Sequence, residues 1–249
     1  MFILNPPPAG VRQEADRKTN PLLAAWVRYM MPAIERERRD FQRIEAALRE
    51  GRNPLNMPNF NDKESLRLAV HEMRPTLRAF RARELCVRRF AWAVPTNAAL
   101  AAIARYAPIL EVGAGTGYWA LLLRRRGVDI LPTDRQPPRR RSVKERQYRG
   151  RQSRQFVPIT RMGAAKAAGR YPQRSLFLCW PPHNDPMADQ ALAHYRGEIV
   201  IFIGEYDGGC NANPAFFKRL ERRFAQIEEV SLPQWTGLHD DLTVWRRIA

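Results

Sequence analysis

The residues with the clearest chemical potential are three alternating glycines and a distant aspartate. Gly113, Gly115 and Gly117 follow the apolar run Ile109–Val112, and an apolar stretch of helical character begins directly after them. Glycines at a strand-to-helix turn allow the backbone to approach a ligand closely, with free N–H groups facing it. Asp134 ends a second apolar run about 20 positions later, where a carboxylate can accept hydrogen bonds from ribose hydroxyls. This spacing indicates a site for a nucleoside-containing cofactor.

The glycine pattern decides between classes of cofactor. The dinucleotide fingerprint G-x-G-x-x-G/A fails at its third position, which is occupied by Tyr118. The observed pattern over Glu111–Gly117 is E-x-G-x-G-x-G, and it resembles motif I of class I S-adenosylmethionine (SAM) dependent methyltransferases. A glycine turn that binds no ligand is the alternative.

This resemblance implies a set of cofactor-binding residues. The acidic residue, the glycines and the distant aspartate would hold the amino-acid part and the ribose of SAM. With their neighbours, the residues expected around SAM are Glu111, Gly113, Ala114, Gly115, Gly117, Tyr118, Trp119 and Asp134. In this family the segment before the preceding helix often folds over the cofactor, so Phe90 and Trp92 are lid candidates by resemblance. The alternative is that both are core aromatics.

A second motif, Cys179-Trp180-Pro181-Pro182-His183, ends another apolar run. It is similar to motif IV of methyltransferases that act on exocyclic or amide nitrogens, where D/N-P-P-Y/F/W is common. The departure is Trp180, because an indole cannot accept the hydrogen bonds of a target amine. Trp180 could instead stack on a flat acceptor, and His183 could act as a general base. Alternatively, Trp180 packs under the cofactor and His183 lies in an exposed loop.

One more acidic residue belongs to the candidate catalytic set. Glu205 follows the apolar run 198–204 directly and could be a base or a substrate anchor. The predicted catalytic residues are therefore Trp180, Pro181, Pro182, His183 and Glu205. Cys179 is not expected to be a nucleophile, because it follows Leu178 instead of Pro or Thr and a buried strand cysteine behaves as a small hydrophobe.

Composition is typical of a globular protein in a reducing compartment. The 249 residues are 45% hydrophobic, and no apolar run approaches the ~20 residues that cross a membrane. The N-terminus lacks the basic region and long apolar stretch of a secretory signal. Three widely spaced cysteines argue against a disulfide framework and against a metal site. We expect a cytoplasmic protein with no membrane contact.

Positive charge dominates the chain, with 42 Lys and Arg against 25 Asp and Glu and a net charge of +17. Such a surplus attracts polyanions, nucleic acid first, although a GC-rich genome also produces arginine-rich proteins. Residues 135–155 are rich in arginine and nearly free of apolar side chains, which predicts a solvated or disordered loop beside the cofactor site. This loop could clamp the phosphate backbone of RNA or DNA, or it could be a tolerated surface insertion.

Residues 1–88 form the first of two predicted parts, a helical extension without a cofactor signature. Asn20-Pro21 starts a helix, with Asn as its cap and Pro at the first helical position. Pro32 is expected to kink or break this helix, and Pro75 is expected to separate two further helices.

Residues 89–249 form the second part, in which apolar strands alternate with helices. A third strand is expected over 156–159, and the last two strands have no helix between them. This final pair is similar to the hairpin that closes the class I methyltransferase sheet. We therefore predict an α/β fold: a doubly wound, mostly parallel, seven-stranded Rossmann-like sheet with an N-terminal α-helical extension.

Three functional hypotheses follow from these features. The first is a SAM-dependent methyltransferase whose acceptor is unidentified, with a nucleic acid or a planar nitrogenous group as candidates. The second is a basic nucleic-acid-binding module whose methyltransferase-like core is inactive, motivated by Trp180 and the arginine-rich loop. The third is a small-molecule methyltransferase on which the basic surface is incidental.

Overall fold

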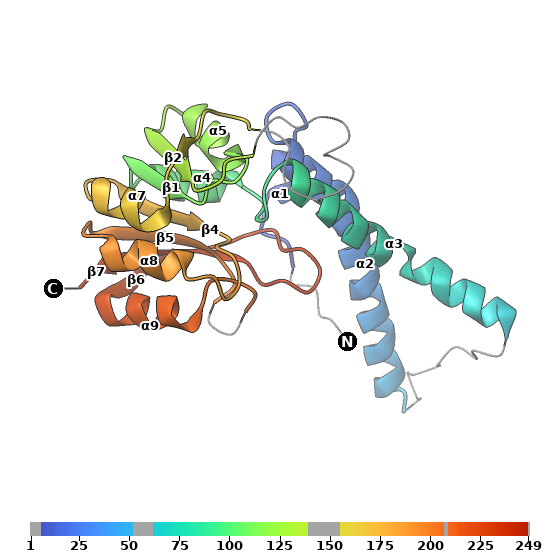
Figure 1. Cartoon of the computed structure of the whole chain (residues 1–249). Helices are drawn as coiled ribbons and strands as arrows, with labels where there is room; N and C mark the ends of the chain where they lie inside the picture. The colour runs from blue at the N-terminus through green and yellow to red at the C-terminus, as the bar shows by residue number, and fades with distance from the viewer. Residues whose placement is uncertain (1–5, 52–61, 139–154, 207–208, 249) are drawn as a thin grey trace.

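The computed structural model describes residues 6–51, 62–138, 155–206 and 209–248 (Figure 1). Within them lies one seven-stranded sheet with the strand order β3-β2-β1-β4-β5-β7-β6. Strand β7 runs antiparallel to both of its neighbours, and the other neighbouring strands are parallel. The predicted doubly wound, mostly parallel sheet with its final hairpin is confirmed. Most of the basic loop predicted for 135–155 lies outside the described residues.

The strands are short, as is usual for an α/β sheet. They are β1 (Ile109–Val112), β2 (Ile130–Asp134), β3 (Thr160–Arg161), β4 (Ser175–Cys179), β5 (Ile199–Gly204), β6 (Phe224–Ser231) and β7 (Asp241–Arg247). The helices are α1 (Val11–Glu14), α2 (Pro21–Arg49), α3 (Lys63–Arg89), α4 (Asn97–Ala104), α5 (Tyr118–Arg124), α7 (Ala164–Arg170), α8 (Met187–His194) and α9 (Pro214–Arg223).

The third strand lies later in the chain than expected, at Thr160–Arg161 instead of 156–159. The apolar residues before it pack against the glycine turn. A Cβ placed on Gly117 would lie 2.8 Å from the Val157 side chain and 3.3 Å from Ile159. Their hydrophobicity therefore reflects this packing and not a position in the sheet.

Each face of the sheet carries its own hydrophobic core because side chains alternate along the strands. Ile109 and Phe177 belong to the core shared with α4 and α5. Leu110, which follows Ile109, and Leu176, which precedes Phe177, belong to the core shared with α7, α8 and α9. Parallel strands of this kind leave their carboxyl ends at one edge, where loops from both faces meet.

The long N-terminal helices run through their prolines. The predicted separation of two helices at Pro75 is therefore wrong, and of the kink or break predicted at Pro32 the break does not occur. A proline removes one i→i−4 hydrogen bond, and helices of 29 and 27 residues keep enough other bonds to continue past it. Helices α2 and α3 pack against each other and project together beyond the sheet (Figure 1). Among the described residues, no helix is both long and apolar enough to span a membrane.

The start of α2 is fastened to the sheet domain, and Leu22 and Trp26 lie in the same core as α5. Asn20 is the fixed point of this contact. Its Oδ1 caps α2 by accepting from the Leu23 amide at 3.2 Å and also accepts from the Tyr118 hydroxyl at 2.9 Å. Its Nδ2 donates to the Pro95 carbonyl at 2.8 Å. The hydrophobic core is thus continuous across the predicted boundary at residue 88.

We expect Asn20→Ala to lower the free energy of unfolding by about 2–4 kcal/mol. It removes a helix cap worth about 1 kcal/mol and leaves a buried hydroxyl and a carbonyl without their partner. The matched control is Asn213→Ala. The Asn213 side chain caps α9 by accepting from the Phe216 amide, and it makes no other hydrogen bond in the described structure. That control should cost about 1 kcal/mol. Urea unfolding measures both, and equal losses would contradict the role given to Asn20.

Candidate functional site

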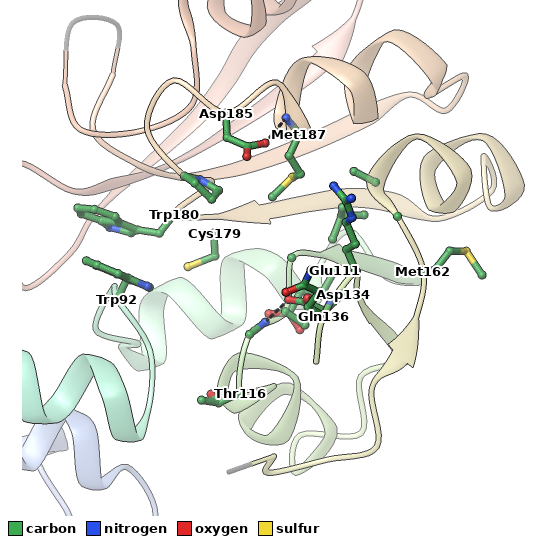
Figure 2. Close-up of a pocket in the computed structure, with 18 of the residues that line it drawn as sticks. Trp92, Glu111, Thr116, Asp134, Gln136, Met162, Cys179, Trp180, Asp185 and Met187 are labelled. Carbon is green, nitrogen blue, oxygen red and sulfur yellow. Dashed lines mark hydrogen bonds between the residues drawn. The ribbon is translucent and has the colours of Figure 1, made fainter. Parts of the chain in front are cut away.

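A cavity of about 830 Å³ opens at the carboxyl ends of β1, β2 and β4 (Figure 2). Of the predicted cofactor and catalytic residues, those on its wall are Phe90, Trp92, Glu111, Gly113, Ala114, Gly115, Tyr118, Trp119, Asp134, Trp180 and Pro182. Gly117, Pro181, His183 and Glu205 are not on the wall. The structure thus brings together the two motifs that the sequence separates by more than sixty residues.

The glycine turn is held tightly against β2. The amides of Gly113 and Ala114 both donate to the Thr133 carbonyl, at 2.9 and 3.0 Å. Gly113 has a φ of 78°, and a Cβ there would lie 2.8 Å from Met187 Cε. Glycine is therefore required both by the backbone conformation and by the close approach of a cavity side chain.

The backbone amides of the three glycines are bonded within the protein. The Gly115 amide donates to Asp134 at 3.0 Å, and the Gly117 amide donates to the Ala114 carbonyl at 2.7 Å. The first residues of α5, Tyr118 and Trp119, lie on the cavity wall, and amides in the first turn of a helix have no acceptor within that helix.

Asp134 is oriented by backbone donors on both of its oxygens. Oδ2 accepts from the Gly115 amide at 3.0 Å, and Oδ1 accepts from the Gln136 amide at 2.7 Å. A carboxylate has about four acceptor positions, so each oxygen keeps capacity for a ligand. An oriented carboxylate with spare acceptor capacity suits a pair of neighbouring hydroxyl groups.

Glu111 is the most perturbed group on the cavity wall. Its side chain is 2% exposed, and Oε2 has no hydrogen-bond partner among the described residues. The pKa of Glu111 is raised to about 8, first by burial and then by the negative charge of Asp134, against a smaller opposing effect of Arg124. The carboxyl is consequently neutral at pH 7 and would become charged if a cation lay beside it.

The segment before α4 closes one side of the cavity through two different aromatic residues. The Thr116 hydroxyl donates to the Phe90 carbonyl, and the Phe90 ring packs against Tyr118 at a centroid distance of 5.2 Å. Phe90 is buried, whereas Trp92 is 42% exposed. Phe90 is thus a buried core aromatic on the cavity wall, and Trp92 is a half-exposed residue of the same wall.

Trp180 lies face to face with Trp92 across the end of the cavity (Figure 2). The ring centroids are 4.9 Å apart and the planes are inclined by 13°. The Trp180 indole donates to Asp240 Oδ1 at 2.8 Å, and its backbone has a φ of 53°, which bulky residues rarely adopt. The guanidinium of Arg83 lies over both rings, 5.6 Å from Trp92 and 6.0 Å from Trp180. Trp180 thus lies on the cavity wall, stacked on Trp92.

The rest of the second motif is less available for catalysis than the sequence suggests. The Pro181 carbonyl already accepts from the Ala212 amide at 3.1 Å and from Asn211 Nδ2 at 3.5 Å. Pro182 lines the cavity. His183 is exposed, with its ring 3.0 Å from the side-chain amide of Asn184. The exposed-loop alternative describes His183 in this structure.

Glu205 fastens two loops to each other. Its Oε2 accepts from the Cys210 amide at 2.7 Å, and its Oε1 accepts from the His239 amide at 3.0 Å. Both carboxylate oxygens are engaged by backbone groups, and the side chain is buried away from the cavity wall. These contacts are those of a structural clamp between the loops that follow β5 and precede β7.

Several residues on the cavity wall were not predicted from the sequence. They include Gln136, Met162, Lys166, Cys179, Asp185 and Met187. Each follows the carboxyl end of β2, β3 or β4, or ends β4, and that position is the signal that could have identified them. Cys179 keeps its proton, because burial raises its pKa. Within the described residues, no group of three His, Cys, Asp or Glu could hold a metal ion.

Comparisons with known proteins give resemblances to solved structures alone. No protein-family model matches it, and no curated protein matches it. Solved structures that resemble it include magnesium protoporphyrin IX methyltransferase from Synechocystis PCC 6803 with bound SAM, at 12% identity and a TM-score of 0.40. That match covers 61% of this chain and 77% of the other.

Two further structures are the 1,6-didemethyltoxoflavin-N1-methyltransferase of Burkholderia thailandensis and the N-methyltransferase NodS of Bradyrhizobium japonicum WM9. The first is 18% identical with a TM-score of 0.36 and covers 61% of this chain and 78% of its own. The second is 11% identical with a TM-score of 0.33 and covers 60% and 93%. All three TM-scores are below 0.5, so these matches carry no conclusion about this chain. The strand order itself is that of the doubly wound, seven-stranded Rossmann-like sheet predicted from the sequence.

The raised pKa of Glu111 predicts a specific dependence of stability on pH. Its folded-state pKa of about 8 exceeds its ordinary value of 4.5, so the stabilisation is complete below about pH 4.5 and is lost as pH rises toward 8. This group should lower the free energy of unfolding by up to about 1.4 kcal/mol per pH unit in that window.

Glu111→Gln should remove this part of the slope, because the amide stays neutral at every pH. Asp240, whose pKa burial raises to about 7, contributes equally to both proteins and cancels in the difference. Urea unfolding of both proteins at pH 5, 6, 7 and 8 measures the effect. Parallel profiles for the two proteins would contradict a buried, protonated Glu111.

Proposed function

We propose that the chain is a SAM-dependent methyltransferase. One observation carries the proposal: two carboxyl groups at the ends of neighbouring strands face one cavity beside a glycine turn. Asp134 is oriented by two backbone amides, and Glu111 has a buried oxygen without a hydrogen-bond partner among the described residues. The pair offers one acceptor site for hydroxyl groups and one site that a cation would satisfy.

The chemical parts of SAM fit these residues. Its ribose diol suits the oriented carboxylate of Asp134, and its amino-acid ammonium suits the unpartnered oxygen of Glu111. The thioethers of Met162 and Met187 add apolar, polarisable surface to the same cavity, which suits a flat purine. A cavity of about 830 Å³ is within the range of small-molecule and cofactor sites.

Bound SAM would supply an electrophilic methyl group on a sulfonium. The chain contributes position and proton removal, because methyl transfer requires an aligned acceptor that loses a proton. The paired rings of Trp92 and Trp180 provide an aromatic wall against which a planar nitrogenous acceptor can stack. The proposed acceptor is therefore a flat, nitrogen-containing ring, free or within a nucleic acid.

Proton acceptance needs a group other than those of the second motif. The Trp180 indole donates to Asp240, and the Pro181 carbonyl is already occupied by two donors. Asp185 lies on the cavity wall in the same loop, with Oδ1 bonded to the Met187 amide at 2.8 Å. In this proposal its carboxylate accepts the acceptor's proton in place of His183.

An inactive methyltransferase-like core would also have the Trp180 indole and the Pro181 carbonyl already engaged in hydrogen bonds. A basic nucleic-acid-binding module that has lost catalysis is therefore the second candidate function. It differs in one property: this module needs no cofactor, so the affinity of the purified protein for SAM separates the two functions.

We expect Asp134→Ala to weaken SAM binding at least tenfold, because it removes a charged acceptor of two hydroxyl hydrogen bonds. The matched control is Asp129→Ala, which removes the same charge before the opposite end of β2, where the carboxylate is exposed and paired with Arg174. That control should bind SAM like the wild-type protein. Isothermal titration with SAM and with S-adenosylhomocysteine measures all three proteins. A wild-type protein that binds neither ligand would refute the proposed function.

A further inference from the structure

One face of α3 carries a row of arginines. At about 100° per residue, positions 67, 74, 78, 81 and 88 fall within one arc of about 80° and extend along about 32 Å of helix. All five side chains, Arg67, Arg74, Arg78, Arg81 and Arg88, are exposed. The acidic positions of the helix, 64, 72 and 84, fall outside this arc. We call these five residues the arginine face.

The arginine face is not neutralised by the protein in its described part. Elsewhere several arginines have carboxylate partners, as in the pairs Arg174–Asp129 and Arg219–Asp189. No ion pair with a described residue involves a member of the arginine face. A row of like charges without counterions costs repulsion in the free protein and attracts a polyanion.

The helix that carries this face leads directly to the proposed acceptor wall. Arg83, on the packed side of α3, lies over the rings of Trp92 and Trp180. The end of α3 continues into Phe90–Trp92, which lines the cavity, and Arg135 and Lys166 add positive charge to the cavity wall. Positive charge is thus present from the far end of α3 to the cavity.

Exposed aromatic rings lie outside the arginine face, one on another side of α3 and one beside the cavity. Phe80 is 48% exposed on α3, and Trp92 is 42% exposed beside the cavity. Binding of single-stranded nucleic acid combines a basic track for the phosphates with aromatic rings on which bases stack. A paired base is inaccessible inside a duplex, so chemistry on a base also favours an unpaired strand.

We propose that the arginine face of α3 binds the phosphates of a single-stranded polynucleotide and directs the strand toward the cavity. The binding surface depends on α3 alone. The destination of the strand rests on the proposed function, because it assigns the acceptor wall to a base of that strand. The proposed surface does not include the basic loop 135–155, most of which lies outside the described residues.

The test compares three proteins in binding to a fluorescein-labelled 20-nucleotide poly-uridine at 50–200 mM NaCl. Arg74→Ala/Arg78→Ala/Arg81→Ala should weaken binding at least tenfold and lower the salt dependence, the slope of log affinity against log salt, by about 2. The control Arg170→Ala/Lys218→Ala/Arg222→Ala removes three exposed positive charges from α7 and α9 and should bind nearly as the wild type does. Poly-thymidine of the same length shows whether the sugar matters.

The remaining measurements make the proposal falsifiable. Circular dichroism should show equal thermal midpoints for the wild type and the arginine-face variant, because the substituted side chains are exposed. SAM affinity should also be unchanged in this variant, so failure of the surface is distinguishable from failure of the cofactor site. The proposal is overturned if the wild type ignores the poly-uridine, if both triple variants weaken alike, or if a duplex or phosphatidylserine vesicles bind more tightly than the single strand.

Discussion

The site depends on the electrostatic interaction between the carboxyl groups of Glu111 and Asp134, which lie toward the carboxyl ends of β1 and β2. The Thr133 carbonyl accepts hydrogen bonds from two amides of the glycine turn, and Asp134 accepts a hydrogen bond from a third amide. These three bonds hold the turn against β2. The same arrangement places the charge of Asp134 beside the buried Glu111 and raises the pKa of Glu111 to about 8. A site built this way holds a proton when empty and favours a cation when filled, because either one satisfies the buried carboxyl.

The N-terminal helices complete the site instead of standing apart from it. Asn20 bonds Tyr118 at the start of α5 and Pro95 in the segment that covers the cavity. That segment is bonded to the glycine turn as well, through the Thr116 hydroxyl. At its other side, Arg83 of α3 lies over the paired tryptophans. A small set of contacts from α2 and α3 therefore connects the glycine turn, the segment before α4 and the paired tryptophans. These helices carry no cofactor motif.

The sequence predicts the part of this molecule that depends on local pattern. Gly113 and Asp134 predict the two strands that precede them and the sheet edge that these strands share, because the prediction rests only on residue type and spacing. Long-range contacts have no such signal: the partner of Trp180 is Asp240, sixty residues away. The titration range of histidine predicts a general base at His183, yet His183 is exposed, and Asp185 lies on the cavity wall instead. Helix propensity predicts a kink or break at Pro32 and a break at Pro75, because it does not include how well a long helix tolerates one lost hydrogen bond.

Proton release on cofactor binding tests the role of Glu111 most directly. Titration of the wild-type protein with SAM at pH 6.5, in buffers of different ionisation enthalpy, counts the protons released. Because Glu111 is protonated in the free protein and would pair with the SAM ammonium, we predict release of about one proton. Glu111→Gln should release none, and neither should the wild type with 5′-methylthioadenosine, which lacks the ammonium. SAM binding without proton release would contradict the account.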